Sequence, residues 1–310
     1  SLREIVTLKG RIYPLRPLIS FSYPSIISFL FLFFFNEVLI RVLFQSFPSE
    51  LGLYQFAVRI TTYIVTFTLG FYAATGPHLT QALGEGGPKQ LENELRWTMK
   101  VSFFIFLPLI IGVMVIAPAL FLLLFHTLGY YWSYRYFLIL MIQPVLFLFY
   151  RPYYRVLLAE ARTKLLLLIS VASAIVSGLI MILLMPFGLY YVVIGYVSNT
   201  LISTILLAIW IRRVEKISLH LRHVMPFLVI ACTMIIPAVI IHLLRFSPVI
   251  EIGLIIGVSA LVYFIPIRSL NLITEKEIKK ATVFLPKRLA KPLASFLIWL
   301  FVKKSSRITN

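Results

Sequence analysis

The chain has little of what soluble enzymes and metal sites are built from. Its 310 residues include one cysteine, Cys232, and 11 acidic residues. A single cysteine excludes an internal disulfide and a cysteine metal site. His220 and His223 have a spacing that suits a metal, but no third ligand is close to them in the sequence. No Ser/His/Asp set and no phosphate-binding glycine loop is present. The sequence therefore predicts no metal site, no cofactor and no enzyme.

Apolar residues, in contrast, are in excess. They make up 60% of the chain, and the mean hydropathy of +0.96 exceeds what a soluble core of this length requires. About 20 consecutive apolar residues are needed for a helix to cross the roughly 30 Å of a bilayer core. Such runs predict an all-α fold, a polytopic membrane helical bundle of about eight transmembrane helices. The expected spans are 17–44, 53–83, 101–125, 136–158, 165–185, a sixth ending at 211, 224–244 and 249–267.

The net charge of +18 is unevenly distributed along the chain. With eight spans, 25 of the 29 Lys and Arg residues fall in the termini and alternate loops of one side, and only Arg135 and Arg245 lie on the other. This is the positive-inside bias, which attraction to anionic lipid reinforces. It predicts a multi-pass protein of the cell membrane with both termini in the cytoplasm. A nucleic-acid partner is not expected, because no compact soluble domain carries the charge.

The spans predict four parts of the chain. A cytoplasmic lead-in, 1–16, precedes a six-helix bundle, 17–211, then an additional helix pair, 212–268, and a basic cytoplasmic or interfacial tail, 269–310, in which 292–302 is too short to span. Residues 84–95 are expected to form a Gly-rich loop that continues into a surface helix. In the fifth span Ser170, Ala174, Ser177 and Gly178 form a small-residue face that allows close helix packing. Ser1 replaces an initiator Met and no signal peptide follows, so we expect a further part upstream.

Three ionisable residues lie within the first two spans, where an unpaired charge costs several kcal/mol. Glu37 and Arg41 are four residues apart and can pair on one helix face. On the second span Gln55, Arg59, Thr62 and Thr66 form one polar stripe. We expect these two faces to meet in the protein interior. Glu37 is a candidate for exchanging H⁺ or Na⁺ and Arg59 for holding a phosphate oxygen. The alternative is a structural ion pair that fixes helix packing.

Other polar groups lie deeper in the chain. Gln143 is at mid depth in the fourth span and Asn199 is in the sixth. At the cytoplasmic end of the fourth span, Arg151 and Arg155 belong to the sequence YRPYYR, which could receive an anionic lipid headgroup. Arg and Tyr side chains that only anchor a helix end at the membrane interface give the same sequence pattern. Both interpretations therefore stay open for this cluster.

The run from Asn36 to Leu83 resembles the polysaccharide flippases of the multidrug/oligosaccharidyl-lipid/polysaccharide exporter superfamily. In those proteins an acidic residue near a helix end is followed by a short turn, a Gly-hydrophobic-Tyr pattern, a small residue before Arg or Lys, and a Pro in the next helix. The corresponding elements here are Glu37, the turn FPSE, Gly52-Leu53-Tyr54, Ala57-Val58-Arg59 and Pro77, then the glycines from Gly84 to Gly87. The resemblance covers residues 15–268. Glu37 stands where Asp is more usual, and Arg41 where Gly or an apolar residue is common.

The resemblance implies two pseudo-symmetric six-helix bundles, often with an extra C-terminal helix pair, that move lipid-linked saccharides by alternating access. The eight expected spans match the second bundle plus that pair, so the first bundle or partner subunits would lie outside this chain. The implied cargo is a lipid-linked saccharide or a similar anionic lipid. The headgroup cavity is expected to be lined by Arg59, Arg41, Gln55, Thr62, Gln143 and Asn199. The alternatives are a cation-coupled drug or metabolite exporter and a non-transporting scaffold subunit.

Overall fold

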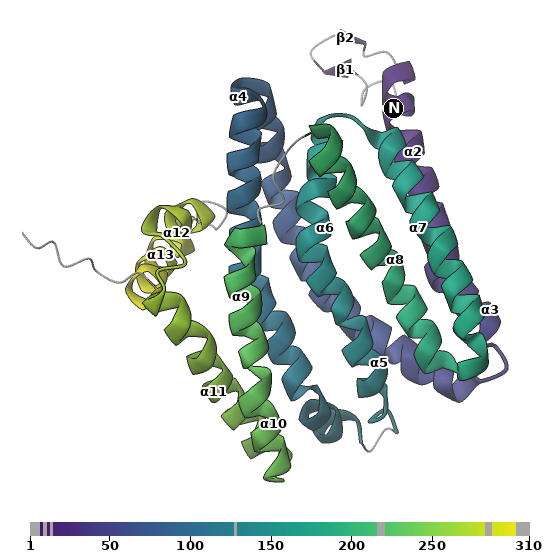
Figure 1. Ribbon diagram of the computed structural model, residues 1–310, viewed down its shortest axis with the longest axis vertical. Coiled ribbons are helices and arrows are strands. Elements are labelled where there is room, and N and C mark those ends of the chain that lie inside the picture. The colour runs from purple at the N-terminus through teal and green to yellow at the C-terminus, as the bar shows by residue number, and fades with distance from the viewer. Residues whose placement is uncertain are drawn as a thin grey trace, which may run out of the picture.

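The computed structural model describes residues 7–8, 11–12, 15–126, 129–215, 221–282 and 287–301. Over these ranges the chain is a bundle of helices (Figure 1), accompanied by a two-residue antiparallel strand pair in which Thr7 is opposite Ile12. The predicted all-α membrane bundle is confirmed. The helices are α2 (Leu15–Phe33), η1 (Phe34–Val38), α3 (Leu39–Leu43), α4 (Pro48–Phe125), α5 (Ser133–Leu140), α6 (Ile142–Ala159), α7 (Thr163–Leu184), η2 (Met185–Phe187), α8 (Leu189–Trp210), η3 (Ile211–Glu215), α9 (Leu221–Thr233), α10 (Ile235–Leu243), α11 (Pro248–Ser269), α12 (Glu275–Thr282) and α13 (Lys287–Phe301), and the strands are β1 (Thr7–Leu8) and β2 (Arg11–Ile12).

Seven helical segments of the described chain are long and apolar enough to cross a membrane, and a shorter apolar helix covers Ile19–Phe33. That shorter helix belongs to the first predicted span, 17–44, which the structure forms as a helical run from α2 through η1 to α3. The π-helical segment η1 contains Glu37 and divides this run. The full-length segments are Pro48–Glu85, Lys89–Phe125, Ser133–Ala159, Thr163–Phe187, Leu189–Val214, Arg222–Leu243 and Pro248–Ser269.

Helix α4 consists of two long helices joined by a sharp turn at Gly87. This residue has φ +65° and ψ −162°, a conformation that glycine adopts without the steric cost that a Cβ imposes. The two halves, of 38 and 37 residues, meet at the end labelled α4 in Figure 1 and run from there in opposite chain directions. The predicted Gly-rich loop and separate surface helix at 84–95 are therefore wrong. A single glycine makes the turn, and its neighbours remain helical.

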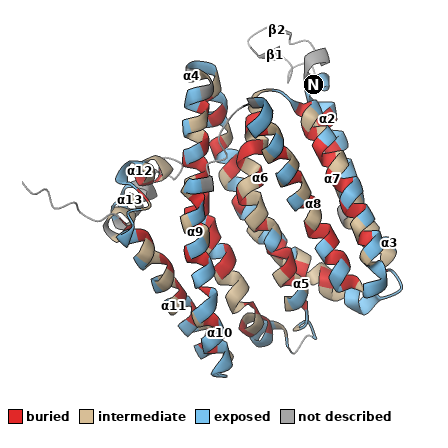
Figure 2. Cartoon of the chain, viewed as in Figure 1, coloured by how far each residue is buried: buried red, intermediate tan, exposed pale blue. Residues whose placement is uncertain are grey.

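Close packing joins the helices into a curved row in the order α2, α7, α8, α6 and α4, with α9 and α11 beyond α4 (Figure 1). Small residues permit this packing, as predicted for the fifth span. A Cβ added to Gly195 on α8 would lie 2.8 Å from Met181 Cγ on α7, and one added to Gly178 would lie 2.5 Å from Phe35 Cδ1. The Ser203 hydroxyl donates a hydrogen bond of 2.7 Å to Ser173 Oγ. Buried and exposed residues alternate along each helix in Figure 2.

The helices after α11 dock onto the half of α4 that follows Gly87. Lys100 Nζ on α4 lies 2.8 and 2.9 Å from the two carboxylate oxygens of Glu277 on α12. Although burial alone raises the pKa of the Glu277 carboxyl, hydrogen bonds from Lys100 and the Thr274 N–H hold it below its ordinary value. At the end of α13, Phe301 contacts Phe104 on α4 in an edge-to-face arrangement. The predicted tail thus packs on the bundle over its described part, and residues 283–286 and 302–310 lie outside that part, as do His220 and most of the lead-in.

Candidate functional site

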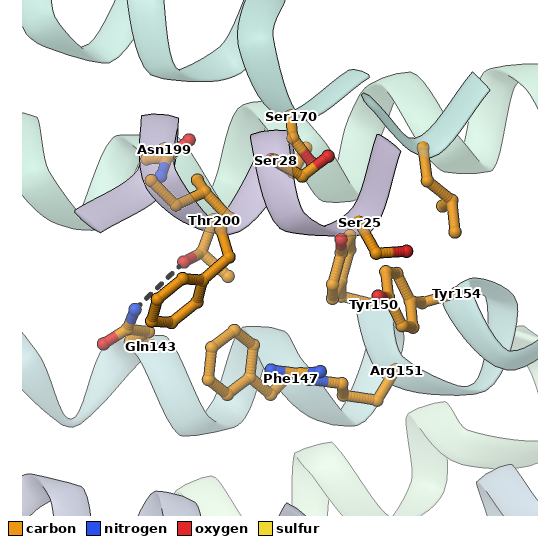
Figure 3. Close-up of a pocket in the computed structure, with 14 residues that line it drawn as sticks. Ser25, Ser28, Gln143, Phe147, Tyr150, Arg151, Tyr154, Ser170, Asn199 and Thr200 are labelled. Atoms are coloured by element: carbon orange, nitrogen blue, oxygen red, sulfur yellow. Dashed lines mark hydrogen bonds between the residues drawn. The ribbon is translucent and has the colours of Figure 1, made fainter. Parts of the chain in front are cut away.

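A polar cavity of about 230 Å³ lies among α2, α6, α7 and α8 (Figure 3). We call it the Arg151 cavity. Among the described residues that line it, none is a carboxylate and Arg151 is the one cation. The lining consists of Ser25, Ser28, Phe29, Leu32, Gln143, Phe147, Tyr150, Arg151, Tyr154, Leu166, Ser170, Asn199, Thr200 and Ser203.

Helical periodicity brings these side chains together. On α6, Gln143, Phe147, Arg151 and Tyr154 recur at intervals of four, four and three residues and so share one face. The other three helices contribute hydroxyl and amide groups at the same spacings, such as the hydroxyls of Ser25 and Ser28 on α2 and the amide of Asn199 with the hydroxyl of Ser203 on α8. One wall of the cavity is therefore aromatic and cationic, and the facing walls carry hydroxyl and amide groups.

The guanidinium of Arg151 is surrounded by aromatic rings. Its Cζ atom lies 4.8 Å from the ring centre of Phe147, 5.8 Å from that of Tyr150 and 5.6 Å from that of Tyr154. Such contacts with aromatic rings stabilise a cation, but they do not accept the in-plane hydrogen bonds that its N–H groups can donate. The Nε of Arg151 is buried and has no hydrogen-bond partner among the described residues. Because a partly buried cation without a carboxylate among its described neighbours is costly within a membrane bundle, this site favours an anion.

A series of polar side chains leads from the Arg151 cavity toward Glu37. Gln143 Nε2 donates a 3.3 Å hydrogen bond to Thr200 Oγ1 (Figure 3). The Gln143 side chain also lies within interaction range of the Tyr196 phenol. The phenol of Tyr196 in turn lies within electrostatic range of the Glu37 carboxylate. Gln143 and Tyr196 thus connect the cavity electrostatically with the carboxylate on η1.

The sequence-predicted site residues divide into two groups. Gln143, Asn199 and Arg151 come together as lining of the cavity. The remaining candidates do not line it, so the expected grouping of the first two spans with Gln143 and Asn199 is corrected. Those residues are Glu37, Arg41, Gln55, Arg59, Thr62 and Arg155.

The polar faces of the first two spans also do not meet in the interior, contrary to the prediction. Arg59 and Thr62 are exposed, and the side chain of Arg41 is 55% exposed. The physical reason is that α2 and η1 pack on the small-residue face of α7, where Phe35 meets Gly178. The predicted pair within one helix does form, with Arg41 Nη2 3.2 Å from Glu37 Oε2.

Arg155 lies one turn beyond Arg151 and faces α4. Its Nη1 would be 3.5 Å from a Cβ placed on Gly76, so the absence of a side chain at Gly76 gives it space. The cavity residues that were not predicted as site residues include four serines, which are Ser25, Ser28, Ser170 and Ser203. Their signal was available, because Ser170 already belonged to the predicted small-residue face and Ser203 lies four residues after Asn199.

A family model, MatE, matches residues 24–184, which is just over half of the chain. The matched range contains the cavity walls contributed by α2 and α6 and the cavity residues of α7, and it ends before α8. No curated protein and no solved structure matches the chain. The match covers the first five predicted spans, which include the run from Asn36 to Leu83 that carried the resemblance. The chain therefore belongs to the MatE family of membrane transporters, within the multidrug/oligosaccharidyl-lipid/polysaccharide exporter superfamily.

Proposed function

We propose that this transporter carries a lipid-linked saccharide, or a similarly anionic lipid, from the cytoplasmic to the outer leaflet by alternating access. The observation that carries the proposal is the Arg151 cavity, which holds a half-buried arginine with a buried Nε and has no carboxylate among the described residues that line it. Arginine recognises phosphate through paired N–H donors. The hydroxyls of the facing walls suit the hydrogen-bonding groups of a sugar. The role that we propose for the protein is transport rather than catalysis.

The size of the cavity indicates how the cargo enters. Its volume of about 230 Å³ is below the roughly 300–1,000 Å³ of typical small-molecule sites. In this conformation it accommodates a phosphate group, and a saccharide needs α2 to separate from α6 and α8. Such separation is the rocking of helices that alternating access requires. The lipid tail remains in the bilayer between helices.

The orientation in the membrane follows from charge. The Gly87 turn, the start of α7 and the end of α8 lie at one end of the bundle in Figure 1. Their neighbourhoods carry cations such as Lys89, Lys164 and Arg212. By the positive-inside rule we propose that this end faces the cytoplasm, which would place both termini there. We also propose the plasma membrane as the location of the protein.

Glu37 supplies the coupling to an ion gradient in this proposal. Its carboxylate pairs with Arg41 at 3.2 Å and reaches the cavity through Tyr196 and Gln143. Binding of H⁺ or Na⁺ at Glu37 would release Arg41 and change the electrostatic field along this series. Cargo binding and ion binding are then linked.

A transport assay with purified protein in vesicles tests the cargo. The probe is a fluorescent polyprenyl-diphosphate saccharide whose appearance in the outer leaflet is followed by chemical quenching. Arg151→Ala should lower the rate about 10- to 100-fold, since a hydrogen bond to a charged group contributes about 1.5–3 kcal/mol. The matched control is Arg212→Ala, which removes an exposed arginine outside the cavity. An unchanged rate in Arg151→Ala would remove the cavity from the mechanism.

A cation-coupled exporter of drugs or metabolites is the second candidate. It is favoured by the Glu37 side chain, which is 29% exposed and so accessible to a cation. In that case Glu37→Gln would abolish efflux of a cationic dye, whereas Arg151→Ala would leave the dye efflux intact. The opposite pattern, loss of saccharide-lipid transport in Arg151→Ala, supports the flippase.

A further inference from the structure

Two adjoining hollows lie along α7 and α8 outside the Arg151 cavity. The first, of about 340 Å³, is lined by apolar side chains that include Leu168, Ala172 and Ile209. The second, of about 680 Å³, is lined by polar, cationic and apolar residues from α2, from the loop before α7, from the first turn of α7 and from the end of α8. The two hollows share Leu165 and Trp210. They therefore form one continuous depression, which we call the α7–α8 groove.

Cations gather at one end of the α7–α8 groove. Arg162 and Lys164 line the second hollow and Arg213 lines the first. The Arg162 guanidinium lies 4.9 Å from the ring centre of Trp210 and its Nε is 3.1 Å from Glu160 Oε2, so its charge is partly compensated. Lys164 and Arg213 are exposed, and no ion pair joins either to a carboxylate whose side chain the structure describes. This end of the groove is therefore electropositive.

The apolar part of the groove extends away from these cations along both helices. Ala172 lies seven residues beyond Leu165 on α7, and Leu206 lies seven residues before Arg213. At 1.5 Å per residue both walls run about 10 Å, which is about two thirds of the roughly 15 Å hydrocarbon depth of one leaflet. A water-soluble anion has no apolar part that could pack against these walls. A membrane lipid has an acyl chain that can.

We infer that the α7–α8 groove binds an anionic phospholipid of the leaflet on the positively charged side of the bundle. The phosphate lies at Lys164 and Arg213, and one acyl chain follows the apolar walls past Leu168 and Ala172. Charge complementarity selects this occupant over a zwitterionic lipid. The site is separate from the cargo cavity, which uses Leu166 and Ser170 on another face of α7, so the inference does not depend on the proposed function.

The test compares lipid retention in mixed bilayer discs. The full chain is released from discs of equal phosphatidylglycerol and phosphatidylcholine, and the lipids that stay bound are identified by native mass spectrometry. Phosphatidylglycerol should be retained in preference. Lys164→Ala and Arg213→Ala should each lower that preference about fivefold, the factor expected per surface cation. Arg268→Ala, which removes an exposed cation outside the groove, is the matched control and should leave the preference unchanged.

A second pair of variants tests the apolar part. Ala172→Trp fills the groove and should lower retention of phosphatidylglycerol, whereas Leu261→Trp, at an exposed position on α11 outside the groove, should not. Soluble glycerol phosphate should fail to compete. Equal retention of both lipids, unchanged retention in the Lys164→Ala/Arg213→Ala double variant, or displacement by glycerol phosphate would each overturn the inference. The charge variants decide the question even if Ala172→Trp does not fold, because both cations are exposed.

Discussion

Gly195→Ala should weaken the contact between α7 and α8. The added Cβ would lie 2.8 Å from Met181 Cγ, 3.0 Å from its N and 3.1 Å from its Cα. Two of these atoms belong to the backbone, so α7 itself must move. Overpacking of this kind costs about 1–3 kcal/mol. Alanine in a helix also stabilises by about 0.4–1 kcal/mol relative to glycine, so the free energy of unfolding should fall by about 1 kcal/mol net.

The matched control is Gly257→Ala on α11. No atom lies within 4 Å of the Cβ that this change adds, so only the stabilising effect on the helix remains and the free energy of unfolding should rise. The measurement is denaturant unfolding in mixed micelles, followed by tryptophan fluorescence. Subtracting the two variants cancels the helix propensity and leaves the overpacking cost, about 1–3 kcal/mol. Equal effects of both variants would refute the inference that close backbone contact holds α7 against α8. Gly178→Ala should fall between them, because it meets the side chain of Phe35 alone within 3.4 Å.

Three further changes test other contacts. Ser203→Ala should lower the free energy of unfolding by about 0.6 kcal/mol, the average for a hydrogen bond between membrane helices, and the same micelle unfolding assay measures it; no change would show that the 2.7 Å contact with Ser173 is not a stabilising bond. Because the pKa of Glu277 is lowered in the folded chain, the stability that its ionised form provides is present above its unfolded pKa of about 4.3 and is lost as the pH falls through its folded pKa. Trp97, which packs on Lys280 at 4.7 Å, should change its fluorescence in that acidic range in the parent and not in Glu277→Gln; identical titrations would contradict this. Glu37→Gln should remove the dependence of transport on an H⁺ or Na⁺ gradient, and a retained dependence would exclude Glu37 as the coupling group.

Much of the fold follows from apolar run length alone. The predicted spans 165–185 and 249–267 agree with helices to within two residues at each end, since α7 covers Thr163–Leu184 and α11 covers Pro248–Ser269. The turn at Gly87 was harder to predict. Several glycines there permit a loop, and only the packing between the two halves of α4 determines that one of them turns while the others remain helical.

The candidate site was only partly predictable for a related reason. Periodicity shows that Gln55, Arg59 and Thr62 share one helix face, but it does not show what covers that face. Polar residues also recur at helical spacing around Gln143 and around Asn199, and these two side chains line a cavity. Arg59 belongs to a similar pattern but is exposed. The difference arises from the choice of helix partner, which depends on close contacts such as Phe35 with Gly178. A sequence pattern confined to one helix does not contain that information.

The two halves of α4 are longer than the hydrocarbon core of a bilayer is thick. At 1.5 Å per residue, helices of 38 and 37 residues are about 56 Å long, whereas the hydrocarbon core is about 30 Å thick. The excess projects beyond the apolar layer as a stalk around Gly87, and α12 is fastened to it through Glu94 and Lys100. A change of about 10° in tilt, small beside the roughly 40° range of membrane helices, displaces the tip by about 10 Å. A small rotation within the bilayer therefore becomes a large movement at the surface, where another molecule can detect it.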